Sequence, residues 1–217
     1  MMAFINSTRG FQFLGVVGSL IVVVGSLITA LVYRGKEGQS YSPLNHYISE
    51  LGEVGVSKLA WVFNLSLILS GLFLIPACIS LGLMLPGIIA KIGMAVGIVC
   101  SILLSLVGFF PMHKPEAHRF VAMWYFRTGL GMVFLFSLAI AFQRAADPVL
   151  SRWFALAGFP AMLSFAVFLI MAPRIPEEDN PLANEDLDRP KAWPLVIVEW
   201  LIFLTIVVWF VLIAWGM

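Results

Sequence analysis

Long apolar runs separated by short polar segments dominate the pattern of this chain. Most runs extend for about 20 residues, the length that a helix needs to cross the roughly 30 Å hydrocarbon core of a bilayer. No run shows the strict alternation that is typical of a lipid-facing barrel strand. The pattern predicts transmembrane helices over residues 11–33, 59–85, 92–110, 120–142, 153–172 and 193–216.

The composition supports this interpretation. Of the 217 residues, 61% are hydrophobic and 12% are charged, and the mean hydropathy is +0.99. A soluble domain carries about a quarter charged residues, so this chain could not cover itself with a hydrated surface. Its length suits one bundle and leaves no room for a second domain. We therefore expect an all-α fold, a polytopic six-helix transmembrane bundle that forms a single domain over residues 1–217.

An even number of spans places both termini on the same side of the membrane, which we call side A. The loops 85–91 and 143–152 also lie on side A, whereas loops 34–58, 111–119 and 173–192 lie on the opposite side, side B. Counting cations alone would place side B inside the cell, although its cations are interleaved with acids. The short loops of side A are almost purely cationic, which favours a multi-pass cell-membrane protein with cytoplasmic termini.

The loops on side B differ in character. Residues 173–192 are acidic and rich in proline, which predicts a solvated connection, with a lid or a weak divalent-cation surface as the alternative. Residues 41–56 instead mix aromatic, small and isolated polar residues. That mixture predicts a segment that folds back against the bundle.

Small residues predict one close helix contact. Gly93, Gly97, Ser101 and Ser105 recur at every fourth position, so they share one face of a helix. Small residues allow helices in lipid to approach each other closely.

Three polar residues inside the predicted spans have similar depths. Asn64, Arg127 and Glu199 lie roughly 8–11 Å below the surface of side B. An unpaired ionisable group at such a depth costs at least ~2 kcal/mol, which predicts that Arg127 pairs with Glu199. Such a pair could fix the helix register or form the floor of a polar cavity. His118 and Arg127 are nine residues apart, on opposite faces of a regular helix, so they share a cavity only if His118 lies in a loop.

All three histidines, His46, His113 and His118, fall on side B, and Ser49 and Glu50 follow the first of them closely. A metal site is one interpretation, but the spacing matches no standard zinc signature. Activation of Ser49 by a histidine is a second, and histidines that bond loop carbonyls or lipid phosphates are a third. The sequence has no phosphate-binding loop and no basic face for nucleic acid, and we predict no cofactor.

Several of these residues carry a resemblance to a known family. The run Tyr41-Ser-Pro-Leu-Asn-His-Tyr-Ile-Ser-Glu-Leu-Gly52, together with Phe63-Asn64, Gly108-Phe-Phe-Pro111 and His118, resembles a prokaryotic six-helix membrane family that is a domain of unknown function. The run is also distantly similar to the Frag/DRAM/Sfk group, some members of which act in lipid-anchor remodelling, autophagy or lipid organisation. The resemblance implies lipid handling and an extracytoplasmic side B, and it implies no catalytic residue.

We therefore expect a protein that binds a membrane lipid or small amphiphile in a cavity open to side B, where Arg119 and Arg127 meet an anionic headgroup. A membrane-embedded lipid-modifying enzyme, metal-dependent or not, is the first alternative, with Ser49, Glu50, His46 and His118 as candidate catalytic residues. A small transporter is the second, or a subunit of a homo-oligomer or membrane complex. The expected ligand-binding residues are His46, Ser49, Asn64, His118, Arg119, Arg127 and Glu199.

Overall fold

The fold is a bundle of long helices, as the sequence predicts. The computed structural model describes residues 2–143, 148–174 and 189–217. After a short first turn, α1 (Met2–Ile5), six helical spans follow that are long and apolar enough to cross a membrane. They are α2 (Thr8–Val32), α3 (Ala60–Met84), α4 (Ile88–Phe109), α5 (Pro115–Ala141), α6 (Phe159–Met171) with its flanking turns η2 (Arg152–Gly158) and η3 (Ala172–Arg174), and α7 (Pro194–Gly216).

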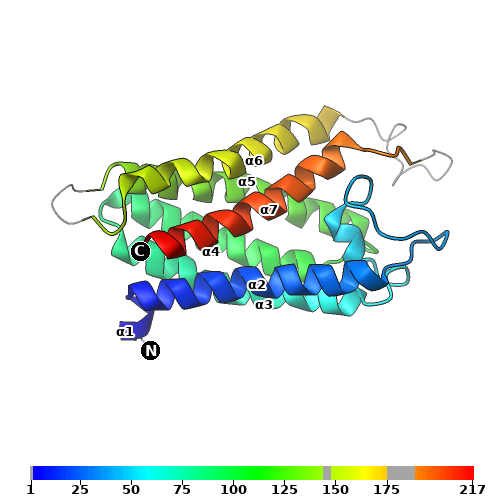
Figure 1. Cartoon of the computed structure of the whole chain (residues 1–217), viewed down its shortest axis with the longest axis horizontal. Coiled ribbons are helices and arrows are strands. Elements are labelled where there is room, and N and C mark those ends of the chain that lie inside the picture. The colour runs from blue at the N-terminus through cyan, green and yellow to red at the C-terminus, as the bar shows by residue number, and fades with distance from the viewer. Residues whose placement is uncertain (1, 144–147, 175–188) are drawn as a thin grey trace.

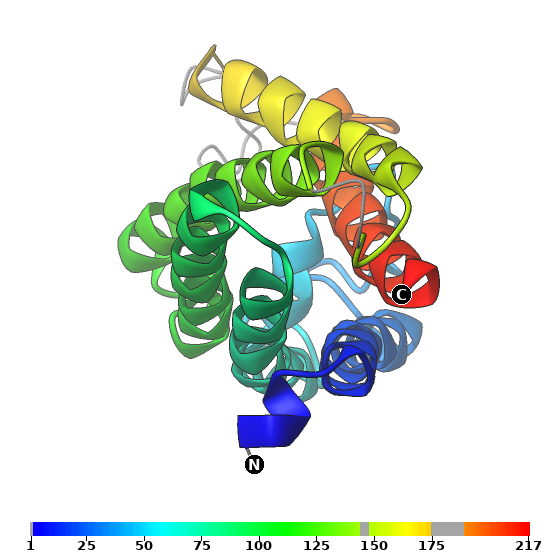
Figure 2. The ribbon, with the colours of Figure 1, turned by 90° about the vertical axis from the view of Figure 1, so that its left-hand side faces the viewer.

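The helices form a closed ring. Each helix from α2 to α6 packs against the next one, and α7 packs against both α6 and α2. Figure 2, which views the bundle along its length, shows the six helices around the turn η1 (Ile48–Gly52). The segment between α2 and α3 therefore enters the ring at one end.

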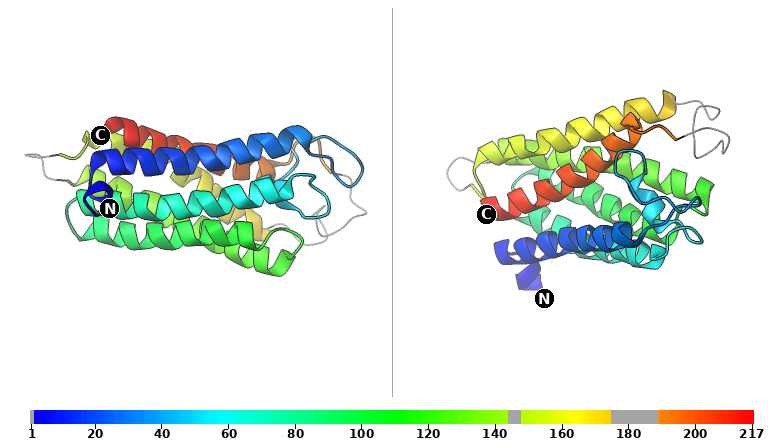
Figure 3. Two further views of the ribbon diagram at one scale, coloured as in Figure 1. Left: turned by 90° about the horizontal axis from the view of Figure 1, so that it is seen from below. Right: turned by 45° about the vertical axis from the view of Figure 1, so that its right-hand side comes forward.

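Both chain termini lie at the same end of the bundle, as Figure 1 shows. This end is side A, and the connections from α2 to α3 and from α4 to α5 lie at the opposite end, side B (Figure 3). The predicted six-span architecture, with both termini on one side, is confirmed, and the protein is a multi-pass membrane protein. Most of the acidic segment 173–192 lies outside the described residues.

Helix α5 begins at Pro115, five residues before the predicted span begins at residue 120. Proline suits the first turn of a helix because its missing N–H needs no partner there. Glu116 in the same turn complements the positive end of the helix dipole. This early start places His118 inside the helix. Arg127, nine residues later, therefore points to the opposite face of α5 from His118.

The predicted stripe of small residues lies in a close helix contact. The Ser105 hydroxyl of α4 donates to the Ile68 carbonyl of α3 at 3.1 Å. A Cβ atom added at Gly97 would lie 2.8 Å from the Cys78 sulfur, and one added at Gly71 would overlap Ser101 and Ser105. The α3–α4 contact therefore depends on the absence of side chains on both helices.

Candidate functional site: a cavity closed by the segment after α2

The segment Tyr41–Gly52, which we call the plug, packs into the side B end of the ring. Leu51 is fully buried, and the Tyr47 ring packs edge-on against Trp193, with 5.0 Å between ring centroids. The Asn64 side-chain amide donates to the Gly52 carbonyl at 3.0 Å. The prediction that this segment folds back against the bundle is confirmed, and Asn64 holds the end of the plug.

Glu50 anchors the plug through its carboxylate. One oxygen, Oε1, accepts a hydrogen bond from the Tyr47 backbone N–H at 2.7 Å. Arg189 pairs with the same carboxylate at 2.8 Å and also donates to the Asn45 carbonyl at 3.0 Å. Burial raises the pKa of Glu50 above its ordinary value, and the hydrogen bond and charge of Arg189 oppose that shift. This carboxylate is thus occupied by a structural pair, and no pattern in the sequence indicates Arg189 as its partner.

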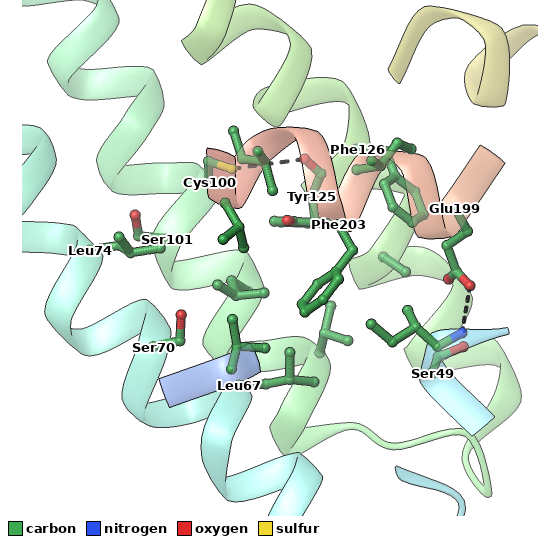
Figure 4. Close-up of a pocket in the computed structure, with 18 of the residues that line it drawn as sticks. Ser49, Leu67, Ser70, Leu74, Cys100, Ser101, Tyr125, Phe126, Glu199 and Phe203 are labelled. Atoms are coloured by element: carbon green, nitrogen blue, oxygen red, sulfur yellow. Dashed lines mark hydrogen bonds between the residues drawn. The ribbon is translucent and has the colours of Figure 1, made fainter. Parts of the chain in front are cut away.

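A long cavity runs from the plug into the middle of the bundle (Figure 4). On α7 it is lined from Glu199 to Phe210, a distance of about 16 Å by the usual helical rise. Its walls are mainly apolar, with leucine, isoleucine, valine and phenylalanine side chains. Three polar side chains line its side B end, which we call the mouth: Ser49 of the plug, His118 of α5 and Glu199 of α7.

His118 and Glu199 are each held by a backbone group. His118 Nδ1 lies 2.8 Å from the Phe110 carbonyl oxygen. A carbonyl can only accept, so Nδ1 carries the proton in this bond. Glu199 Oε2 accepts the Ile48 backbone N–H at 2.8 Å, as the dashed line in Figure 4 shows. The mouth is therefore held by bonds to the α4–α5 connection and to the plug.

The predicted pair between Arg127 and Glu199 is wrong. Glu199 bonds the plug, whereas Arg127 is exposed on α5 and lies over the Trp124 ring at 5.1 Å. The physical reason is the start of α5: His118 lies within the helix and lines the cavity, so a residue nine positions later faces away from it. Equal depth in the membrane did not bring the two charges together.

His46 lies in the plug but outside the lining of the cavity. Its ring packs against Tyr33 and Tyr41, with centroid distances of 5.5 Å and 5.3 Å. Its Nδ1 accepts the Ser42 backbone N–H at 3.3 Å, and its Nε2 is buried without a partner among the described residues. Burial, assisted by the charge of Arg189, lowers the pKa of His46 to about 4. The histidine is therefore neutral at pH 7.

The remaining candidates lie at the surface. His113 and Arg119 are both exposed near the start of α5. Over the described ranges, no three histidine, cysteine or acidic side chains form a group that could hold a metal ion. The structure thus brings Ser49, His118 and Glu199 together at one mouth, and places His46, His113, Asn64, Arg119 and Arg127 elsewhere.

A family model described as "Protein of unknown function (DUF998)" matches residues 16–216. The chain belongs to the DUF998 family. This confirms the resemblance to a six-helix membrane family of unknown function, and the DUF998 match includes both the plug and the cavity. No curated protein and no solved structure matches the chain. The fainter similarity to the Frag/DRAM/Sfk group stays a prediction.

Proposed function

We propose that the protein binds the hydrocarbon chain of a membrane lipid or small amphiphile in the cavity. The observation that supports this proposal is the shape of the cavity together with its lining. It is long, its walls are mainly apolar, and the histidine and the acidic residue of its lining, His118 and Glu199, lie at the mouth. Protein interiors are packed about as densely as organic crystals, so an empty apolar channel forfeits many dispersion contacts. A hydrocarbon chain would restore them.

The depth of the mouth supports an amphiphile rather than a fully apolar ligand. Glu199 lies roughly 8 Å from the side B end of α7, and His118 lies within the first turn of α5. A ligand chain in the cavity would run along the bundle, as the chains of the surrounding lipids do. Its polar head would then reach Ser49, His118 and Glu199 close to the interface of side B.

The contacts of the candidate catalytic residues favour binding over catalysis. Glu50 is paired with Arg189, and His46 packs within an aromatic group outside the cavity. Ser49 and His118 share the mouth, but no hydrogen bond joins them within the described part of the chain.

We also propose that side A faces the cytoplasm of a cell membrane. The support is the charge of its short segments, since cytoplasmic loops carry an excess of lysine and arginine. The side A segments contain the cations Arg9, Lys91, Arg144 and Arg152, against the single acid Asp147. The mouth of the cavity would then open on the extracytoplasmic side.

A cavity-filling variant tests the proposed function. Ala122 of α5 lines the cavity, whereas Ala95 of α4 is exposed on the outer surface of the ring. We expect Ala122→Phe to exclude the ligand chain, and Ala95→Phe to serve as the matched control. The measurement is crosslinking in nanodiscs by a lipid with a photoreactive group in its chain, mapped by peptide mass spectrometry.

In the parent protein, adducts should fall on cavity-lining residues such as Leu67, Ile202 and Ile206. Ala122→Phe should remove these adducts, and Ala95→Phe should retain them. Adducts confined to lipid-exposed positions such as Leu72 and Leu204 would overturn the proposed function.

A further inference from the structure

We propose that the mouth selects an amphiphile whose head donates hydrogen bonds, a long-chain alcohol or primary amine, over one with an anionic head. This inference rests on the proposed function and deepens it, because it names the chemistry of the head that the chain carries. It departs from the anionic headgroup expected from the sequence. Two features of the mouth favour a head that donates: the atoms that remain available to a ligand are acceptors, and no cation lies in the described lining.

His118 offers an acceptor to the cavity. Its Nδ1 proton is used in the bond to the Phe110 carbonyl. In a neutral imidazole one nitrogen donates and the other accepts, so Nε2 then carries a lone pair. Since His118 lines the cavity, this lone pair suits an O–H or N–H group of a ligand.

Glu199 offers a second acceptor. Its Oε2 is bonded to the Ile48 backbone N–H, and no hydrogen bond to its Oε1 is found within the described residues. A carboxyl group keeps acceptor capacity beyond one hydrogen bond whether or not it carries a proton, so one backbone N–H leaves part of that capacity unused. Ser49 lines the same mouth with a hydroxyl that can donate or accept. The mouth thus presents two acceptors beside one adaptable hydroxyl.

No lysine or arginine is found among the described residues that line the cavity. Arg189 is bonded to Glu50, and Arg127 lies over Trp124 on the outward face of α5. An anionic head would therefore be buried beside the Glu199 carboxyl group without a cation in the lining to compensate the charge of the head. Burying a charge without a partner is costly, whereas a head that donates forms a hydrogen bond to His118 or Glu199 and leaves no uncompensated anion at the mouth.

Four ligands with one dodecyl chain and different heads test the inference. They are dodecylamine, 1-dodecanol, dodecanoate, and dodecyltrimethylammonium, which has the positive charge of the amine but no N–H donor. Each competes with the photoreactive lipid in nanodiscs at equal membrane mole fraction. We expect the amine and the alcohol to displace the probe at concentrations about tenfold lower than dodecanoate and dodecyltrimethylammonium, as the gain of about one hydrogen bond at the mouth implies.

A conservative variant assigns this preference to the mouth. Glu199→Gln keeps an amide oxygen that can accept the Ile48 N–H but removes the carboxylate. We expect it to weaken displacement by dodecylamine about tenfold and to leave displacement by dodecanoate unchanged or stronger. Glu53→Gln, a change of the same type just after the plug and outside the cavity lining, should alter neither.

The possible outcomes separate this inference from the proposed function. If dodecanoate or dodecyltrimethylammonium displaces the probe as well as dodecylamine does, the inference is overturned, while the adducts lost in Ala122→Phe still support chain binding. If no dodecyl ligand displaces the probe and the probe labels only lipid-exposed positions, the proposed function falls as well.

Discussion

Arg189 donates from Nη1 to both carboxylate oxygens of Glu50, at 2.8 Å from Oε1 and 2.9 Å from Oε2. Glu50 belongs to the turn η1 after α2, and Arg189 lies five residues before the start of α7, 139 positions further along the chain. The bond therefore joins the plug to the segment that leads into α7, at the side B end of the bundle. It holds the plug over the mouth of the cavity together with the 2.8 Å backbone bond from Trp193 to Leu44.

Removing Arg189 should destabilise the protein. Arg189→Met keeps much of the side-chain volume but leaves the Glu50 carboxylate, of which 2% is exposed, without its cation. Breaking a buried ion pair from one side costs about 3–5 kcal/mol, and the partial exposure of Arg189 places the expected loss near the lower value. Thermal unfolding of the purified protein in detergent measures this loss. Lys191→Met is the matched control, because Lys191 is exposed, and should change stability by less than about 0.5 kcal/mol.

The double variant Glu50→Gln/Arg189→Met provides a separate check. It removes both charges, so it should recover part of the stability that Arg189→Met loses. A double variant whose loss equals the sum of the two single losses would show that the two side chains do not interact in the membrane protein.

His46 should make stability depend on pH. Its pKa is about 4 in the folded protein, against an ordinary value of 6.5, because burial disfavours the imidazolium. As pH falls through 6.5, the unfolded chain binds a proton that the folded protein does not bind, so stability decreases. The contribution is constant above about pH 6.5 and falls by about 1.4 kcal/mol per pH unit between there and about pH 4.

A non-titrating variant isolates this effect. His46→Gln can still accept the Ser42 N–H through its amide oxygen, but it takes up no proton in this range. The difference in melting temperature between parent and variant should therefore change between pH 6.5 and pH 4 and stay constant above that range. Parallel melting curves across both ranges would mean that His46 is as easily protonated in the folded protein as in the unfolded chain.

The helices could be predicted from the sequence because each needs only local information. A run of about 20 apolar residues has few other stable arrangements in a bilayer. The plug could be predicted for a similar reason. Tyr41, Tyr47 and Leu51 concentrate apolar surface in one short segment, and that surface is more stable when it is buried against the bundle than when it is exposed to water. The start of α5 was less clear, because residues 115–119 contain three polar side chains and hydropathy cannot distinguish a polar helical turn from a loop.

The partners of the charged residues could not be predicted from depth alone. Arg127 and Glu199 have similar depths, but a helix can direct a side chain toward any side, and here Arg127 faces outward. Arg189 stands at the end of an acidic segment whose composition indicates solvation, and its partner Glu50 is remote in sequence. The backbone N–H of Ile48 gives no signal in the sequence, yet it decides the position of Glu199.

A methyl group should have opposite effects on stability at Gly71, in the close contact between α3 and α4, and at Gly131 of α5. Gly71→Ala would place a methyl group against the Ser101 carbonyl oxygen and the Ser105 hydroxyl, so the helices must separate, at a cost of about 1–3 kcal/mol. Gly131→Ala meets only Val96 Cγ1 at 3.5 Å, an ordinary contact, and should gain about 0.5–1 kcal/mol from helix propensity. Thermal unfolding of both variants compares them directly, and equal melting temperatures would contradict the tight α3–α4 contact.

Cysteine labelling in intact cells tests the orientation of the membrane protein. Cys78 and Cys100 are buried, so an impermeant maleimide should not react with the parent protein. Val54→Cys places an exposed thiol on side B, and Pro86→Cys places one in the short loop between α3 and α4 on side A. Because the side A loops are cationic, we expect Val54→Cys to be labelled in intact cells, and Pro86→Cys only after the membrane is permeabilised. The reverse pattern would place the plug and the mouth on the cytoplasmic side, so that the ligand would be taken from the inner leaflet.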